Sequence, residues 1–256
     1  MNNSKLAAQL FTVRNFCKSE EDIARSMEKI AAIGYQNVQI SGLAKIPADR
    51  MRRIMDDNGL RIIVTHNGFN RFKNELDELI EEHKIYGCSY AGLGSMPGDL
   101  FPRNSEQGFI DFAKEAEEIA QKLEEAGIHF VYHNHHFEFV RFGKKTGLDL
   151  IYDNAPTVQG EIDTHWVVAG GGDPVQWIEK LAGRMDLIHF KDFGINENNE
   201  RVFKEIGEGN LNWPAILAAC EKTGIQWYIV EQDVCEVDPF TSLEISFKNL
   251  RAMGVM

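Results

Sequence analysis

The chain has 256 residues, of which 43% are hydrophobic and 26% charged, a composition typical of a soluble globular protein. Its formal net charge of −12 repels phosphate backbones and therefore argues against a nucleic-acid partner. No apolar stretch approaches the roughly 18 residues that a membrane span needs, so we also expect no membrane partner.

One pattern recurs along the chain: an amphipathic run, a glycine, and then a short apolar run. It occurs at 30–40, 55–65, 85–93, 125–132 and 222–230. Glycine is favoured just past the end of a helix because it enters the left-handed conformation without a steric penalty. Each repeat therefore predicts a helix followed by a buried strand, which is the sequence form of a parallel α/β sheet.

In chain order, the apolar runs predict about eight strands, at 5–10, 35–40, 60–65, 88–93, 128–133, 158–163, 186–190 and 226–231. Helices are predicted between them, at 19–33, 47–58, 71–86, 104–126, 173–182, 212–223 and 240–253. Ser19, Pro47 and Asn212 are typical of helix starts. No linker divides the chain, so we expect a single domain over residues 1–256. Eight βα units in one domain favour an α/β fold of the (β/α)8 TIM-barrel type over a doubly wound sheet.

The cysteines and the start of the chain predict a cytoplasmic location. The four cysteines are scattered, with no C-x-x-C pair, which favours reduced thiols. The first residues lead directly into an apolar run, without the basic segment that begins a secretion signal.

Four polar residues stand at the ends of four apolar runs in the second half of the chain: Glu138, Asp163, His189 and Glu231. A charged group at the end of a buried strand costs free energy unless something there uses it. In a barrel, catalytic groups gather where the strands end. We therefore expect these side chains to bind one divalent metal ion (Mn, Mg, Co or Zn), and their oxygen-rich set suits Mn²⁺, Mg²⁺ or Co²⁺ best. The alternative is four unrelated residues that loop amides or lysines satisfy.

Other polar residues end predicted strands and are expected to line the same site: Gln9, His66, His133, His135 and Lys191. Strand alternation places His133 and His135 on one face, so one of them is expected to contact substrate or metal. Lys191 shares a face with His189. Its ammonium either reaches the substrate or forms an ion pair with Glu161 or Asp163, and the sequence leaves both open.

Several common kinds of site are missing from the sequence. No G-x-S-x-G elbow, P-loop or convincing cysteine nucleophile occurs, which argues against the commonest hydrolases and kinases. The stretch Gly207-Glu-Gly209 lacks dinucleotide-binding spacing and predicts a loop before a helix. Whether this loop contacts substrate or is a simple turn stays open.

The order of these residues resembles the xylose-isomerase-like TIM-barrel superfamily, and within it the proteins labelled sugar phosphate isomerases/epimerases. The resemblance spans nearly the whole chain, and its motifs are Gln9-Leu-Phe-Thr-Val-Arg14, Tyr132-His-Asn-His-x-Phe-Glu138, Asp163-x-x-Trp166, Gly171-x-Asp173-Pro174, Gly183-Arg184, His189-x-Lys191-Asp192, Gly207-x-Gly209 and Glu231-x-Asp233. The series is specific for the superfamily and much less specific for a reaction.

The resemblance implies a metal bound by Glu, Asp, His and Glu, which correspond here to Glu138, Asp163, His189 and Glu231. In the ketose 3-epimerase members the first Glu lies earlier on the fifth strand, near the position of His133. The alternative is therefore that His133 or water completes the metal shell and Glu138 lies on the substrate side.

Two departures from the superfamily's patterns limit what carries over. Trp166 stands where the ketose 3-epimerases carry a second His, so their specificity does not transfer, and we expect Trp166 to contact substrate. A DNA-repair endonuclease branch needs a His at that same position and further ligands after His189, which this chain lacks.

The implied activity is isomerisation or epimerisation of a sugar or keto-sugar through a metal-stabilised enediolate. The residues expected to act in catalysis are Glu138, Glu231, His135 and Lys191, and those expected to bind substrate are Gln9, His66, His133 and Trp166. A keto-sugar or keto-inositol lyase that uses the same metal site is the main alternative, and a non-catalytic sugar-binding barrel is another. No cluster of Arg or Lys marks a phosphate site, so we expect an unphosphorylated sugar. The sequence leaves open whether the chain forms a homo-oligomer.

Overall fold

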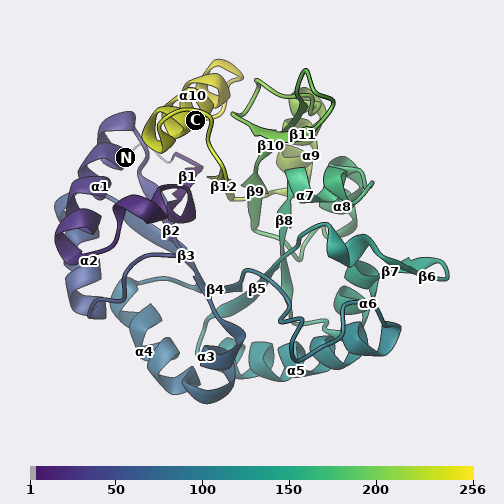
Figure 1. Ribbon diagram of the computed structural model, residues 1–256. Coiled ribbons are helices and arrows are strands. Elements are labelled where there is room, and N and C mark those ends of the chain that lie inside the picture. Colours follow the sequence, from purple (N-terminus) through teal and green to yellow (C-terminus); the bar gives the residue numbers. More distant parts are fainter. Residues whose placement is uncertain (1–3) are drawn as a thin grey trace.

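Eight parallel strands form a closed barrel in the computed structural model, which describes residues 4–256. Around the barrel their order is β1 (Leu6–Gln9), β12 (Trp227–Val230), β9 (Leu187–Phe190), β8 (Gln159–Asp163), β5 (His129–His133), β4 (Tyr90–Leu93), β3 (Arg61–Asn67) and β2 (Asn37–Ile40). The ring closes where β1 pairs with both β12 and β2, and the helices surround it (Figure 1). The fold is the (β/α)8 TIM barrel that the sequence predicts.

Ten α-helices lie between or after the strands of the described chain. They are α1 (Glu20–Ile33), α2 (Ala48–Asp57), α3 (Phe69–Asn74), α4 (Leu76–Tyr86), α5 (Glu106–Glu125), α6 (Gly147–Asn154), α7 (Thr164–Ala169), α8 (Pro174–Lys180), α9 (Trp213–Thr223) and α10 (Pro239–Ala252). The predicted caps are present: Ser19 Oγ accepts a hydrogen bond from the Asp22 N–H, and Asn212 Oδ1 accepts one from the Ala215 N–H. Gly34 ends α1 in the left-handed conformation that the repeated pattern predicts.

Several short elements differ from the sequence prediction. The helix expected at 71–86 is two helices, because the backbone of Glu75 leaves the helical conformation between α3 and α4. Helices α6 and α7 were not predicted, and neither were two hairpins, β6 (Arg141–Phe142) with β7 (Lys145–Thr146) and β10 (Asp192–Ile195) with β11 (Arg201–Lys204). The 3-10 turns η1 (Leu10–Phe16) and η2 (Phe137–Phe139) were also missed. All of these lie in segments that follow a barrel strand and are too short to show clear periodicity.

The barrel interior is apolar at one level and polar at the next. Its apolar level is a small buried cluster made of Ala7, Ile63, Val64, Val131, Leu187 and Ile229. Because side chains alternate along a strand, the residue two positions further on points into the same interior. On five strands that residue is polar: Gln9, His66, His133, His189 and Glu231. The apolar cluster therefore closes the barrel beneath a polar layer at the carboxyl ends of the strands.

A larger apolar core fills the space between the strands and the surrounding helices. Helix α5 contributes Phe109, Phe112 and Leu123, all of them buried, from one face. Within residues 4–256, no helix is both long enough and apolar enough to cross a membrane.

Candidate metal centre

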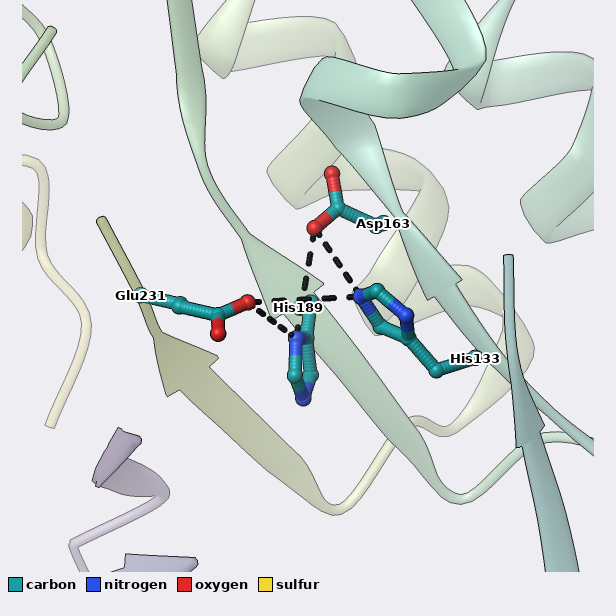
Figure 2. Close-up of side chains that lie close together, drawn as sticks. All are labelled: His133, Asp163, His189 and Glu231. Atoms are coloured by element: carbon teal, nitrogen blue, oxygen red, sulfur yellow. Dashed lines mark hydrogen bonds and ion pairs between the residues drawn. The ribbon is translucent and has the colours of Figure 1, made fainter. Parts of the chain in front are cut away.

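Four side chains at the carboxyl ends of strands bring potential metal ligands together. These residues, called the donor group below, are His133, Asp163, His189 and Glu231, and each offers an atom within 4.8 Å of the others (Figure 2). They come from β5, β8 and β9 and from the residue directly after β12. His133 Nε2 lies 3.2 Å from Asp163 Oδ2, and His189 Nδ1 lies 3.0 Å from Glu231 Oε2. All four residues are buried.

The chemistry of the donor group fits one divalent metal ion. Two imidazoles and two carboxylates suit ions such as Mn²⁺, Co²⁺ or Zn²⁺, which accept both nitrogen and oxygen ligands. Buried carboxylates are costly unless a cation or hydrogen bonds compensate them. The group therefore could hold a metal ion, with two histidines in place of the single histidine that the sequence predicts.

Lys191 provides a positive charge beside the donor group. Its Nζ atom lies close to three carboxylate oxygens, those of Asp163 (2.9 Å), Glu231 (2.8 Å) and Asp233 (2.8 Å). The ion pair with Asp163 was one of the arrangements that the sequence left open. Burial lowers the pKa of Lys191, but the three carboxylates outweigh it and hold this pKa above its ordinary value. The ammonium thus stays charged although it is buried.

The protonation of the donor group follows from these contacts. Burial raises the pKa of Asp163 and Glu231, but Lys191 and the neighbouring histidines hold both values below their ordinary range. Burial lowers the pKa of His189, but the carboxylates of Glu161 and Glu231 raise it to about 10. Without a metal ion, these two carboxylates favour the protonated form of the His189 ring. A metal ion at Nδ1 would take the place of the proton there, because a ligand must be deprotonated.

Glu138 lies outside the donor group, unlike the sequence expectation. Strand β5 ends at His133, and the chain then turns into η2, which contains Glu138. Both carboxylate oxygens of Glu138 already accept hydrogen bonds, at 2.7 Å from the Tyr132 hydroxyl and at 2.9 Å from the His135 N–H. Burial raises the pKa of Glu138 to about 7. This geometry favours His133 as the fourth ligand, the alternative named above.

Three residues expected at the site have buried polar atoms with no hydrogen-bond partner within the described chain: Gln9 Nε2, His135 Nδ1 and Trp166 Nε1. The ring of His135 lies 5.2 Å from that of Trp166, and Lys191 Nζ lies 5.5 Å from the Trp166 ring. Burial, assisted by His133 and Lys191, lowers the pKa of His135 to about 2, so its imidazole is neutral. Unpaired buried polar atoms are costly and are typical of a site that a ligand completes.

Comparison with known proteins agrees with this architecture. A model of the xylose isomerase-like TIM barrel family matches residues 27–252, which is most of the chain. The protein belongs to the xylose isomerase-like TIM barrel family.

Named relatives of this xylose isomerase-like protein fall into more than one reaction class. It is 22% identical to the rhizopine catabolism protein MocC of Rhizobium meliloti, over 91% of this chain and 82% of MocC. It is 24% identical to the inosose dehydratase of Lacticaseibacillus casei over 54% of this chain and 52% of that protein, and so spans about half of its length. The crystal structure of a sugar phosphate isomerase/epimerase from Parabacteroides distasonis has the same fold, with a TM-score of 0.79 at 20% identity over 97% of this chain and 98% of that one.

Two further polar residues of this xylose isomerase-like barrel, Gln39 and Glu161, lie beside the donor group and were not predicted as site residues. Glu161 precedes Asp163 by two residues on β8 and is paired with Leu187, so it lies at the level of the apolar cluster. Its oxygens contact Gln39 Nε2 at 3.0 Å, His189 Nε2 at 3.2 Å and His66 Nε2. Alternation along Gly160-Glu-Ile-Asp163 could have identified Glu161, whereas no sequence signal marks Gln39.

Proposed function

We propose that this protein is a divalent-metal-dependent isomerase or epimerase of a sugar or keto-sugar. The observation that carries the proposal is the convergence of the donor group in the mouth of a xylose isomerase-like barrel. The donor group would hold such an ion, which would supply positive charge to stabilise an oxyanion that develops on the substrate. The structural similarity to a protein named sugar phosphate isomerase/epimerase is consistent with this activity.

Residues of the chain supply the proton transfers that such a reaction needs. One group removes a proton from the carbon beside the substrate carbonyl, and the same or another group returns a proton to a carbon. We assign these roles to the carboxylate of Glu231 and the neutral imidazole of His135, whose Nδ1 has no partner among residues 4–256. Both are weak bases in this site, so the proton transfer would depend on a bound metal ion that makes the substrate C–H more acidic. The ammonium of Lys191 stabilises the developing oxyanion. The contacts of Glu138 support a different role, which is to fix the backbone of His135.

Substrate hydroxyls would bind to the polar atoms that surround the donor group. Gln9 Nε2 and Trp166 Nε1 are buried N–H donors without partners in the described structure, and the Trp166 ring adds a flat apolar surface. His66 is slightly exposed at the carboxyl end of β3 and touches the site through Glu161. These groups suit a neutral polyhydroxylated molecule and support an unphosphorylated sugar as substrate.

A lyase that acts on a keto-sugar or keto-inositol is the second candidate. It is favoured by the sequence similarity to an inosose dehydratase, which covers about half of that protein. The same proton abstraction would begin the reaction, and the enolate would then expel a hydroxyl group from the next carbon. Lys191 could donate a proton to that leaving group, so that it departs as water.

The test is a panel of ketopentoses, ketohexoses and inososes incubated with protein and Mn²⁺ in deuterated water. An isomerase or epimerase incorporates deuterium at the carbon beside the carbonyl, which mass spectrometry and NMR detect. A lyase instead forms an unsaturated ketone that absorbs in the ultraviolet. The His135→Asn variant should keep its metal and lose most of the exchange. Metal-loaded wild-type protein that exchanges no proton with any substrate of the panel would contradict the proposal.

A further inference from the structure

We propose that Gln39 and Glu161 are positioning residues for His189. They determine which of its two ring nitrogens presents a free lone pair to a bound metal ion. The inference rests on the proposed metal site and adds to it two residues that supply no ligand. Both residues are fully buried, at 0% exposure, so no bulk water competes for their polar atoms.

A chain of hydrogen bonds runs from Glu161 through Gln39 to His189. Gln39 Nε2 lies 3.0 Å from Glu161 Oε1, and Gln39 Oε1 lies 2.7 Å from His189 Nε2. Glu161 Oε1 is itself 3.2 Å from His189 Nε2. The three side chains come from β2, β8 and β9 and therefore meet across the interior of the barrel.

The direction of this chain is fixed by the chemistry of its first member. A carboxylate accepts hydrogen bonds and donates none, so the NH₂ end of the Gln39 amide must face Glu161. The carbonyl end of Gln39 must then face His189. Since that carbonyl also only accepts, Nε2 of His189 must carry a proton.

The consequence for His189 is a defined ligand atom. A neutral imidazole has one N–H, so a proton fixed on Nε2 leaves the lone pair on Nδ1. Nδ1 lies 3.0 Å from Glu231 Oε2 and 3.9 Å from Asp163 Oδ2, within the donor group. Figure 2 shows the other ring nitrogen pointing away from the three remaining side chains. The opposite tautomer would turn an N–H toward the metal ion.

The identity of residue 161 matters in this arrangement. A Gln in place of Glu161 could present either its NH₂ or its carbonyl to Gln39, and the Gln39 amide could then flip. A flipped Gln39 would donate to Nε2 of His189 and favour the tautomer that cannot bind metal at Nδ1. The contact of His66 Nε2 with the second oxygen of Glu161 also suits a carboxylate, which accepts on both sides.

Cobalt titration of the whole chain tests the proposal. Co²⁺ binding is followed by its visible absorption in wild type, Glu161→Gln and Gln39→Leu. We expect both variants to bind Co²⁺ about 10- to 100-fold more weakly, as is typical when the partner of a metal-bound histidine is removed. Asp186→Asn is the matched control, because its carboxylate accepts from the Tyr90 hydroxyl at 2.7 Å just before β9, away from the donor group. This control should keep wild-type cobalt affinity.

A second measurement reports which nitrogen of the His189 ring is protonated and which binds the metal ion. In the Zn²⁺-loaded wild type, ¹⁵N NMR should show His189 protonated at Nε2 and metal-bound at Nδ1, and in Glu161→Gln this signature should weaken. If Glu161→Gln does not fold, Gln39→Leu alone tests the proposal. This substitution removes both the NH₂ group and the carbonyl of the Gln39 amide and keeps a side chain of similar volume.

Three results would overturn the proposal. The first is a cobalt affinity of the folded variants within twofold of wild type, which would overturn the positioning role but not the proposed metal site. Zinc bound through Nε2 of His189 would also contradict it. A wild-type chain that binds no cobalt would overturn this inference together with the proposed function.

Discussion

His83 is a single residue whose buried hydrogen bonds make the stability of the fold depend on pH. Its Nδ1–H donates to the Leu79 carbonyl at 2.7 Å, and its Nε2 pairs with the Thr65 hydroxyl at 2.9 Å. Burial lowers the pKa of His83 from its ordinary value of 6.5. The unfolded chain therefore takes up a proton near that pH, whereas the folded chain does so only at lower pH. The stability that depends on neutral His83 is fully present above about pH 6.5 and decreases as the pH falls below it.

We predict that the His83→Gln substitution removes this pH dependence. The variant should be less stable than wild type at pH 7.5. The difference in free energy of unfolding between the two proteins should be smaller at pH 5.5, where the unfolded wild-type chain gains a proton more readily than the folded chain. Urea unfolding at both pH values measures it. A difference that stays constant with pH would show that His83 is protonated in the folded chain as readily as in the unfolded one.

At the scale of elements, Asp192 organises the loop that connects the β10–β11 hairpin to α9. Its carboxylate accepts hydrogen bonds from five N–H groups, those of Phe193, Gly207, Gly209, Leu211 and the Trp213 indole. A side chain at position 209 would collide with it, because a Cβ there would lie 2.4 Å from Asp192 Oδ1. The Gly207-Glu-Gly209 stretch is therefore a loop built around Asp192, and its glycine at 209 is needed for close approach.

We predict that Asp192→Ala lowers the free energy of unfolding by about 3 kcal/mol or more, because five N–H groups, most of them partly buried, lose the charged acceptor that they share. Gly209→Ala should also be strongly destabilising. Asn210→Ala is the matched control within the loop, since its exposed side chain makes none of these bonds, and it should change stability by no more than about 0.5 kcal/mol. Chemical denaturation measures all three. Equal stability of Asp192→Ala and the control would contradict the assignment.

Short elements and the loops after strands show where sequence patterns stop being informative. The long helices and the barrel strands follow from apolar periodicity and glycine caps, as at Gly34. Helix α7 has six residues, and the β6–β7 hairpin pairs only two residues on each side, so neither carries a full period. Their positions are set by contacts with the barrel.

On the scale of the whole molecule, the side chains of the donor group come from the ends of four of the eight barrel strands. Its members come from β5, β8, β9 and the end of β12, so a bound ion would join segments that unfolding separates. Metal at 100 times its dissociation constant should add about 2.7 kcal/mol to stability. For a chain of this length we expect the melting temperature to rise by about 5–10 °C. Differential scanning calorimetry with and without Co²⁺ measures this, and His189→Ala should show no rise.

The geometry of the whole barrel explains which site residues could be predicted from the sequence. Asp163, His189 and Glu231 end apolar runs, and barrel geometry brings such ends together whatever their spacing along the chain. The place of Glu138 could not be read in this way, since it depends on how η2 turns after β5. Alternation along β8 could have identified Glu161, which precedes Asp163 by two residues. Gln39 acquires its importance only from contacts across the barrel, which the pattern of one strand cannot show.

Metal content is the measurement that tests the central claim most directly. Wild type, His189→Ala and Glu138→Gln would be dialysed mildly after purification and analysed for Mn, Mg, Co and Zn. The donor group predicts about one divalent ion per chain in wild type and in Glu138→Gln, and almost none in His189→Ala. Loss of the ion in folded Glu138→Gln would contradict the choice of His133 over Glu138 as fourth ligand. A wild-type chain that contains no metal and takes up none on addition would contradict the metal site itself.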